Sequence, residues 1–348
     1  MEKIKLGVIC GGMSTENEVS VVSASYVLSN LNKEKYEIYP VYIDKNGQWW
    51  EILDEFKPRK FGEEITKKEK IENEFKYLKN LDVIFPVLHG LYGEDGTIQG
   101  LFELLQIPYV GCHVLASSVG MDKVYAKVVF EKAGINQTKS VYVRKYNDKY
   151  VYIDEHFNEE KLSDIDVAKK VQTKIDFPMF VKPSNSGSSV GVKKAENERE
   201  LVEAINYAVQ FDKKVLIEQG IIGREVECAV LGNEDVIASS VGEIKAADEF
   251  YSYDAKYNNQ ESRTEIPANL PKDIIEEIRK QAVKAFKAID GSGLSRVDFF
   301  VENGTNKIYL NEINTLPGFT SISMYPKLFE QAGIKYEDLL DKLIELAL

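Results

Sequence analysis

The stretch that most constrains the fold runs from residue 296 to 314 and reads RVDFFVENGTNKIYLNEIN. Aromatic and β-branched residues alternate with other residues on both sides of an Asn-Gly pair, which predicts two antiparallel strands joined by a tight turn. A three-residue turn would set Arg296 opposite Glu312 and Asp298 opposite Leu310. Because side chains alternate between the two faces of a strand, the polar groups of this hairpin would then gather on one face.

The polar groups of the hairpin suit a metal and phosphate site. Asp298, Glu312 and Asn314 offer the oxygen ligands that Mg²⁺ prefers, and Mg²⁺ usually keeps further positions for water and phosphate oxygens. Arg296 would stabilise an oxyanion that develops beside them. The same residues also fit a hairpin whose charges simply face water. The loop that follows, 315–321, favours the first interpretation, because glycine and hydroxyl residues bring backbone N–H groups near the proposed ligands.

Composition narrows the range of partners. A chain of 348 residues is long enough for two or three domains. Its net charge of −12 argues against nucleic acid or an anionic membrane as the main partner. The three cysteines are far apart, without metal-ligand spacing, and fit buried residues in a reducing compartment. The N-terminal apolar run, 6–10, is too short for a signal peptide, and no segment approaches the roughly 18 apolar residues of a membrane helix. We therefore expect a cytoplasmic protein.

The first 121 residues alternate strands with helices, which predicts an open parallel α/β domain. The expected elements are strands at 4–10, 36–44 and 81–89, helices at 19–31 and 97–106, a surface loop and helix within 54–76, and a short strand and helix within 107–120. Ligands bind beyond the carboxyl ends of parallel strands, which is where Glu18 and His89 fall. Glu18 fits either a helix cap or an acceptor for an ammonium group, and His89 fits either a structural or a catalytic role. The first loop lacks the G-x-G-x-x-G spacing, so a nicotinamide-dependent oxidoreductase is not supported.

After residue 121 the pattern changes to an α+β module. The expected elements are helices at 123–133 and 198–210 and strands at 138–145, 178–182, 190–194 and 214–219. At its centre, residues 181–192 read VKPSNSGSSVGV, where small residues let backbone amides approach phosphate oxygens and Lys182 supplies a positive charge. The same letters fit an ordinary hairpin turn, and no G-K-[ST] leads into a helix as in a Walker A loop. The last strand ends at Glu218, beside Gly220 and Ile221, an acid and backbone suited to an adenine edge.

The third region, from 220 to the end, contains the opening hairpin. It begins with a strand at 223–232 and has amphipathic helices at 272–289 and 336–346 that we expect to pack against the sheet. Between them, residues 250–259 read FYSYDAKYNN, which is rich in aromatic residues yet polar and without a clean period. That composition favours a lid, within 247–262, over a core strand.

Taken together, these segments resemble the D-alanine–D-alanine ligases of the ATP-grasp superfamily over nearly the whole chain. The resemblance rests on GGMSTENEVS at 11–20, HGLYGEDGTIQG at 89–100, MDK at 121–123, VKPSNSGSSVGV at 181–192, FYSYDAKY at 250–257, SRVDFF at 295–300 and NEINTLPGFT at 311–320. It implies an α/β and α+β chain in which an ATP-grasp fold follows an open parallel α/β domain. The domain boundaries we expect are 1–121, 122–219 and 220–348.

The resemblance also implies roles for individual residues. In the nucleotide site, the phosphates contact Lys123, Lys182, Lys256, Ser188 and Ser189, the adenine and ribose contact Glu218, Gly220, Ile221 and Glu225, and two Mg²⁺ ions, which Mn²⁺ can replace, bind Asp298, Glu312 and Asn314. In the substrate site, the ammonium of the first D-alanine meets Glu18, which is joined through Ser188 to Tyr257. His89 lies near the first D-alanine, and Lys256 contacts the transferring phosphate. Arg296 and the N–H of Gly318 form the oxyanion site. Ser323 and Met324 contact the carboxylate end of the second substrate.

The implied activity is the ATP-dependent joining of two D-alanine molecules through an acyl phosphate, for peptidoglycan precursor synthesis, by a cytoplasmic homodimer that binds only small-molecule substrates. Two alternatives stay open. A relative that joins D-alanine to D-serine or D-lactate would share the fold and the first half-reaction, and Met324 stands where many family members have leucine. A non-catalytic, nucleotide-binding regulatory protein would share the fold alone.

Overall fold

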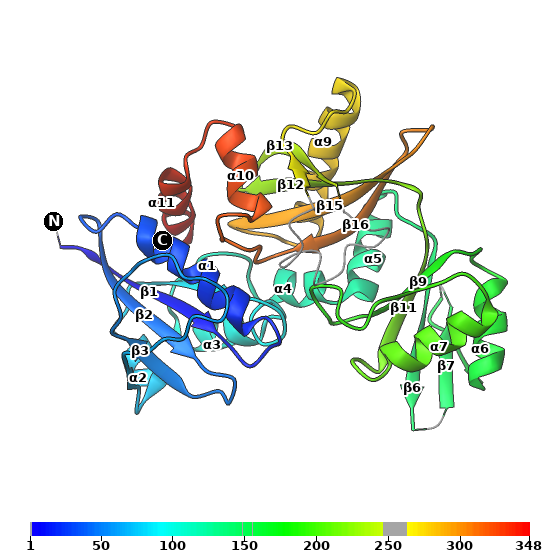
Figure 1. Cartoon of the computed structure of the whole chain (residues 1–348), viewed down its shortest axis with the longest axis horizontal. Helices are drawn as coiled ribbons and strands as arrows, with labels where there is room; N and C mark the ends of the chain where they lie inside the picture. The colour runs from blue at the N-terminus through cyan, green and yellow to red at the C-terminus, as the bar shows by residue number, and fades with distance from the viewer. Residues whose placement is uncertain (1, 148, 155, 246–262) are drawn as a thin grey trace.

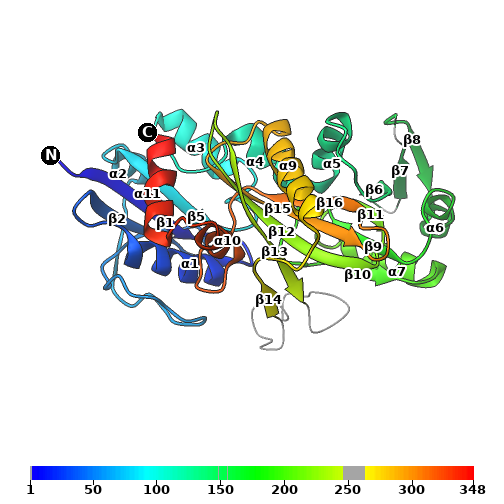
Figure 2. The ribbon, with the colours of Figure 1, turned by 90° about the horizontal axis from the view of Figure 1, so that it is seen from above.

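The computed structural model describes residues 2–147, 149–154, 156–245 and 263–348 (Figure 1). Three sheets follow one another along the long axis of the molecule, as both views show (Figures 1 and 2). The C-terminal helix α11 (Tyr336–Ala347) returns to the N-terminal sheet and contacts α1 (Asn17–Asn30) and β5 (Val83–Leu88). None of the helices in these described ranges is long and apolar enough to cross a membrane.

The N-terminal sheet is the open α/β sheet that the sequence predicts. Its strand order is β4-β3-β2-β1-β5, and β1 (Ile4–Gly11) lies parallel to β2 (Tyr36–Ile43) and to β5. The whole run from Leu6 to Cys10 is buried, as expected of a central parallel strand covered on both faces. The sequence analysis did not predict the antiparallel edge strands. These are β3 (Trp49–Ile52) and β4 (Lys68–Lys70).

The remaining elements of this region are helices. They are α2 (Glu74–Leu78), α3 (Thr97–Leu105) and α4 (Val114–Met121). The strand expected within 107–120 is wrong: that stretch contributes only a single bridge between Tyr109 and Ile84 before α4 begins. Helix α4 packs against β16 (Ile308–Asn314) of the third sheet and therefore connects the first and third sheets.

The second sheet is antiparallel, in the order β10-β9-β11-β6-β7-β8. Its strands are β6 (Ser140–Tyr146), β7 (Lys149–Ile153), β8 (Glu159–Leu162), β9 (Met179–Pro183), β10 (Lys193–Ala195) and β11 (Lys214–Gln219). Helices α6 (Asp164–Gln172) and α7 (Glu198–Ala208) pack together on one face. Helix α5 (Lys123–Lys132) contributes Val124 to a small apolar cluster with β6, β7 and β11. The sequence analysis missed β7, β8 and α6, and it placed β10 three residues too early.

The third sheet has the order β14-β13-β12-β15-β16. Its strands are β12 (Gly223–Leu231), β13 (Ile237–Lys245), β14 (Arg263–Glu265), β15 (Leu294–Glu302) and β16 (Ile308–Asn314). Val226, Cys228 and Val230 join a core with α9 (Lys272–Ala288), whereas Ala229 and Leu231 join a core with α10 (Met324–Gln331) and α11. This alternation shows that β12 is covered on both faces. Strands β13 and β14 and helix α10 were not predicted from the sequence.

The hairpin forms as predicted, but its register differs. The turn holds four residues rather than three, because Glu302 N bonds to Lys307 O and Asn306 N bonds to Glu302 O. A second irregularity lies between Asp298 and Phe299, where one extra residue of β16 bulges out of the ladder.

The two irregularities together move the register by two residues at the functional end of the hairpin. Arg296 therefore pairs with Asn314, and Asp298 pairs with Glu312, rather than Arg296 with Glu312 and Asp298 with Leu310. Since a shift of two keeps every side chain on its face, the predicted gathering of the four polar groups on one face is confirmed. We propose the three sheets as the cores of domains 1–121, 122–219 and 220–348.

Candidate active site

A cavity of about 550 Å³ opens where the three sheets meet. Its wall includes residues from the loops after β1, β5 and β9, from the hairpin β15–β16 and from the start of α10. The predicted site residues that line it are His89, Lys123, Ser188, Arg296, Glu312, Asn314, Gly318, Ser323 and Met324. These residues come from segments far apart in the sequence and line one cavity.

The acid from the first loop that lines this cavity is Glu16 and not Glu18, so the expected position of Glu18 in the site is wrong. Ser188 Oγ donates a short hydrogen bond to Glu16 Oε1. Glu18 instead faces solvent, with its side chain 54% exposed and 3.1 Å from Lys45 Nζ. The reason is that α1 begins at Asn17, two residues earlier than expected, so Glu16 lies in the loop that faces the cavity while Glu18 is on the outer side of the first helical turn.

Two glycines make room for the Glu16 carboxylate. A Cβ at Gly187 would lie 2.8 Å from Glu16 Oε2, and one at Gly90 would lie 2.6 Å from the same atom. The loop after β9 and the loop after β5 therefore close on this carboxylate only because neither carries a side chain there. The result is a buried carboxylate that faces into the cavity.

His89 lies beside this acid and is 4% exposed. Its Nε2 is 3.1 Å from Ser23 Oγ, and its Nδ1 is 3.1 Å from Leu316 O and 3.5 Å from Glu94 Oε1. Burial opposes protonation of the imidazole, but the hydrogen bond and charge of Glu94 outweigh it and raise the pKa of His89. Burial likewise raises the pKa of the Glu94 carboxyl. The imidazole of His89 and the carboxyl of Glu94 are thus held beside each other after the end of β5.

Arg296 is held by acids on two strands. Its Nε and Nη2 donate to the two oxygens of Asp298 at 2.8 and 2.7 Å, and its Nε is 3.1 Å from Glu227 Oε2 on β12. Burial opposes the charge on the guanidinium, but Asp298 and Glu227 outweigh it and keep the pKa of Arg296 well above its ordinary value. Asn314 Nδ2 donates to Asp298 Oδ2 at 3.0 Å. The hairpin therefore presents a fixed, fully charged arginine to the cavity.

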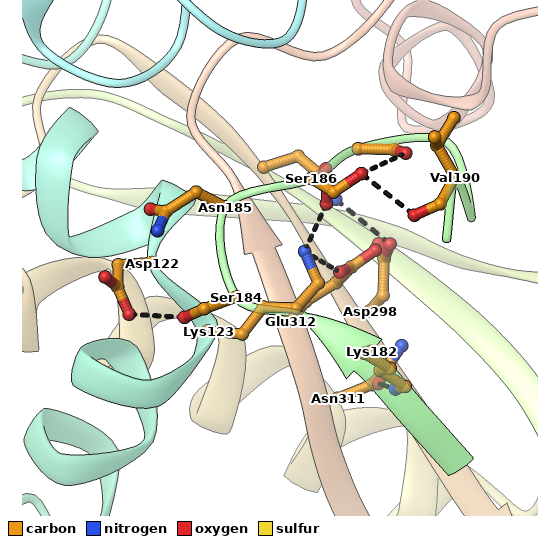
Figure 3. Close-up of polar contacts among 12 residues, drawn as sticks. Asp122, Lys123, Lys182, Ser184, Asn185, Ser186, Val190, Asp298, Asn311 and Glu312 are labelled. Carbon is orange, nitrogen blue, oxygen red and sulfur yellow. Dashed lines mark hydrogen bonds and ion pairs between the residues drawn. The ribbon is translucent and has the colours of Figure 1, made fainter. Parts of the chain in front are cut away.

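Lys123 joins the loop after β9 to the hairpin (Figure 3). Its Nζ donates to Ser186 O at 2.8 Å and is 3.3 Å from Glu312 Oε2. Asp122, which caps α5, accepts from Ser184 Oγ at 2.7 Å and forms a close ion pair with Lys214. These contacts fix the start of α5 against the base of the loop, so the Lys123 ammonium lies where the loop amides and the hairpin acids meet.

The loop after β9 needs unusual backbone angles. Ser188 and Ser189 have φ values of 48° and 60°, and Gly191 has a φ of 79°. Within the loop, Ser186 Oγ donates to Val190 O at 2.9 Å (Figure 3). Successive residues near the left-handed region turn backbone N–H groups toward one side, a geometry that favours anions.

Lys182 and Glu218 lie deeper, next to the second sheet. Glu218 is 4% exposed, and Lys182 Nζ is 2.6 Å from its Oε2 and 3.3 Å from Asn311 Oδ1. Burial alone would raise the pKa of the Glu218 carboxyl, but the charges of Lys127 and Lys182 outweigh it and lower that pKa. Burial opposes the charge on Lys182 in turn, and Glu218 outweighs it, with smaller contributions from Glu312 and Glu225, so the pKa of Lys182 is raised.

The other predicted residues are placed as follows. Gly220 and Ile221 form the link between β11 and β12, and the Gly220 N–H already donates to Pro178 O at 2.8 Å. A Cβ at Gly318 would lie 2.8 Å from Ser323 Oγ, which itself accepts from Thr320 N. Met324 is 6% exposed and both lines the cavity and belongs to the core around α10. Lys256, Tyr257 and the rest of the expected lid lie outside the described residues.

The donor set on the hairpin fits Mg²⁺ bound together with a polyphosphate. Asp298, Glu312 and Asn314 contribute two carboxylates and one amide, which is too few oxygens for a closed metal site but suits an ion that shares phosphate oxygens. The described part of the chain holds no group of three or more His, Cys, Asp and Glu side chains arranged for a metal.

Sequence reasoning missed Glu16, Glu94, Glu227 and Lys127. Glu16 and Glu94 lie within quoted motifs, so a more exact start for α1, and attention to the acid that follows His89, would have found them. Glu227 pairs with Asp298 across β12 and β15, and Lys127 reaches Glu218 from α5. Both depend on tertiary neighbours for which the sequence carries no local signal.

Comparisons with known proteins agree with this geometry. The family models described as "D-ala D-ala ligase N-terminus" and "D-ala D-ala ligase C-terminus" match residues 5–112 and 129–345. The D-alanine--D-alanine ligase of Acetivibrio thermocellus is 50% identical, with 99% of this chain and 96% of that protein covered. The D-alanine--D-alanine ligase of Clostridium novyi is 46% identical, with 99% and 98% covered.

Two solved structures are similar over the whole chain. The VanG D-Ala:D-Ser ligase from Enterococcus faecalis has a TM-score of 0.85 and 36% identity, with 100% of both chains covered. The D-alanine-D-alanine ligase from Coxiella burnetii has a TM-score of 0.80 and 34% identity, with 100% of this chain and 94% of that chain covered.

Proposed function

Because this chain belongs to the D-alanine–D-alanine ligase family, we propose that it joins two D-alanine molecules to D-alanyl-D-alanine, with ATP converted to ADP and phosphate. The observation that carries this proposal is the shared cavity. A buried carboxylate, Glu16, lies at one end, and the Lys123 ammonium and the Arg296 guanidinium lie on its other walls. An amino acid bound by its ammonium at Glu16 would direct its carboxylate toward the cationic side.

In the first step, an oxygen of the first D-alanine's carboxylate attacks the γ-phosphorus of ATP, and the bond to the ADP oxygen breaks. Negative charge builds on the transferring group, and we propose that Lys123 and Lys182 offset it. Mg²⁺ held by Asp298, Glu312 and Asn314 would supply further positive charge to the phosphates. The resemblance adds Lys256, which we propose contacts the same phosphate.

In the second step, the neutral amine of the second D-alanine attacks the carbonyl carbon of the acyl phosphate, phosphate leaves with the electrons of the C–O bond, and the new amide nitrogen loses a proton. The tetrahedral intermediate carries an oxyanion, for which we propose Arg296 and the Gly318 N–H as donors. A donor of this kind typically contributes about 10²–10³-fold to turnover. The ion pairs of Arg296 with Asp298 and Glu227 support this role, because they fix the guanidinium before the charge develops.

Further details of the proposal rest on the resemblance. We propose that two Mg²⁺ ions are bound, that Mn²⁺ substitutes for them, that Tyr257 joins the Glu16–Ser188 pair, and that the enzyme is a cytoplasmic homodimer acting in peptidoglycan precursor synthesis. Glu225, Gly220 and Ile221 would contact the ribose and adenine. Ser323 and Met324 would border the carboxylate of the second substrate.

Joining D-alanine to D-serine is the second candidate, favoured by the likeness to the D-Ala:D-Ser ligase. Met324, at the proposed site of the second substrate, gives D-serine no advantage. A Cβ at Gly242 would lie 2.4 Å from Met324 Cε, so the end of this side chain packs against β13. The thioether is a poor hydrogen-bond acceptor, which gives D-serine's hydroxyl no strong partner there.

A competition assay separates the candidates. The enzyme is supplied with ATP, Mg²⁺ and equal concentrations of D-alanine, D-serine and D-lactate near neutral pH, and the products are read by mass. We expect mostly D-alanyl-D-alanine. Mostly D-alanyl-D-serine or depsipeptide would overturn the proposed choice of second substrate, and ATP binding without any product would favour a non-catalytic regulator.

A further inference from the structure

Lys127 is a buried lysine for which the proposed reaction gives no role. It lies on α5, one turn after Lys123, and is 7% exposed. Its Nζ is 2.6 Å from Glu218 Oε1 and 3.3 Å from Thr138 Oγ1. Thr138 Oγ1 in turn donates to Glu218 Oε1 at 2.8 Å. A buried ammonium is costly unless it is paired, so this lysine has a specific reason to be there.

Glu218 is held from two sides. Lys127 and Thr138 contact Oε1, whereas Lys182 contacts Oε2 at 2.6 Å. The two lysines differ in what else they face. Lys182 also faces Asn311 on the hairpin, toward the proposed phosphates. The contacts of the Lys127 ammonium are with Glu218 and Thr138. Nucleotide binding would therefore share the charge of Lys182 with phosphate oxygens, while Lys127 would stay with the carboxylate.

The protonation state of the Glu218 carboxyl would determine which purine base it can bind by hydrogen bonds. An ionised carboxylate only accepts hydrogen bonds, whereas a protonated one also donates. The 6-amino group of adenine is a donor, and the 6-oxo group of hypoxanthine or guanine is an acceptor. A buried carboxyl without a cation tends to take up a proton, which would remove the basis for this distinction.

We propose that Lys127 is a positioning residue for nucleotide-base selection, which holds the Glu218 carboxylate ionised and fixed so that it accepts from the 6-amino group of adenine. This inference rests on the proposed use of ATP and on the proposed contact of Glu218 with adenine. A purely structural ion pair would have a different signature, because losing it would lower the amount or stability of folded enzyme without changing its choice of base.

The test compares ATP with inosine triphosphate, which carries the 6-oxo group. Lys127→Met removes the charge, Lys127→Arg keeps it, and Thr138→Val removes only the hydroxyl. Lys132→Met is the matched control, because Lys132 is an exposed lysine on the same helix. Initial rates of ADP or IDP formation with saturating D-alanine give kcat and KM for each nucleotide, and thermal unfolding gives the folded state of each variant.

For Lys127→Met we expect the ratio of kcat/KM for ATP to that for inosine triphosphate to fall at least tenfold, mainly through KM for ATP, with KM for D-alanine within twofold of wild type. Lys127→Arg should recover most of the ratio, Thr138→Val should lower it about threefold, and Lys132→Met should leave it unchanged. A folded Lys127→Met enzyme with an unchanged ratio overturns the inference. If that variant does not fold, an unchanged ratio in Thr138→Val overturns it instead.

Different results would contradict the proposed function and the proposed role of Lys127. A wild-type enzyme that forms no dipeptide counts against the proposed function. Equilibrium binding of ATP and inosine triphosphate to the same variants, measured by calorimetry, then tests Lys127 without turnover, with the same expected loss of base preference and the same contradicting result.

Discussion

Replacing Glu16 by glutamine tests the assignment of the ammonium site. Glutamine keeps the size of the side chain, and its amide oxygen still accepts from Ser188 Oγ, so the change isolates the negative charge. Glu18→Gln is the matched control, two residues away. The structure predicts that only the first substitution affects the binding of D-alanine.

The size of the effect follows from burial. Glu16 is 8% exposed, and a hydrogen bond between charged groups in such a place contributes about 1.5–3 kcal/mol. At about 1.4 kcal/mol per factor of ten, Glu16→Gln should lower kcat/KM for D-alanine by about 10–100-fold. The Glu18 side chain is 54% exposed and its partner Lys45 is 61% exposed, and exposed pairs of this kind contribute little. Glu18→Gln should therefore stay within twofold of wild type.

The assay measures the initial rate of ADP formation at saturating ATP and Mg²⁺ while D-alanine is varied, with thermal unfolding of each variant as a check on folding. KM for ATP should change less than twofold in both variants, because the proposed nucleotide contacts are Lys123, Lys182 and Glu218. A Glu16→Gln enzyme within threefold of wild type, together with a tenfold loss in Glu18→Gln, would refute the reasoning.

Three other predictions concern the metal site, the start of α5 and the thiols. Glu312→Gln should fold normally but lose turnover by orders of magnitude, since it removes a charge from the proposed Mg²⁺ site; near-wild-type turnover at saturating Mg²⁺ contradicts that assignment. Burial opposes ionisation of the Asp122 carboxyl, but the contacts with Lys214 and Ser184 outweigh burial and lower the pKa of this carboxyl in the folded enzyme. The stabilisation that the ionised Asp122 provides is therefore present above the ordinary pKa of a carboxyl. It is lost as the pH falls through the lower pKa of the folded enzyme. Asp122→Asn should lower the free energy of unfolding by about 2–3 kcal/mol near pH 7, with a smaller difference near pH 3 in urea titrations, and an equal difference at both pH values counts against the ion pair. Burial raises the pKa of each cysteine thiol to about 12, so an aromatic disulfide reagent at pH 8 should label none in the native enzyme and all three after denaturation, and rapid native labelling contradicts this burial.

The hairpin shows how a functional conclusion can survive a wrong structural detail. The sequence analysis counted three residues in the turn, and the structure has four, followed by a bulge in β16. Neither irregularity has a strong signature in the letters NGTN and YLNE. Together they shift the register by two residues, and a shift by an even number keeps side chains on the same face. A single irregularity would have sent the acids of one strand to the opposite face.

Glu16 shows the opposite case, where a small error changes a residue's role. When the start of α1 is placed at Val19 rather than Asn17, Glu18 becomes the residue just before the helix, the position that Glu16 has in the structure. Helix starts are uncertain by one or two residues, and one residue is about 100° of rotation around a helix. Contacts between distant segments, such as Lys127 with Glu218 or Glu227 with Arg296, could not be predicted. The sequence around one residue of such a pair gives no information about which distant residue it contacts.

The central claim, ligation of two D-alanines driven by ATP, is tested most directly by product stoichiometry. Purified enzyme is incubated with limiting ATP, Mg²⁺ and excess D-alanine, and ADP, phosphate and dipeptide are measured in the same samples. The account predicts one ADP and one phosphate for each D-alanyl-D-alanine formed, and little ADP when D-alanine is omitted. ADP formation that does not depend on D-alanine, or that proceeds without dipeptide, would contradict it.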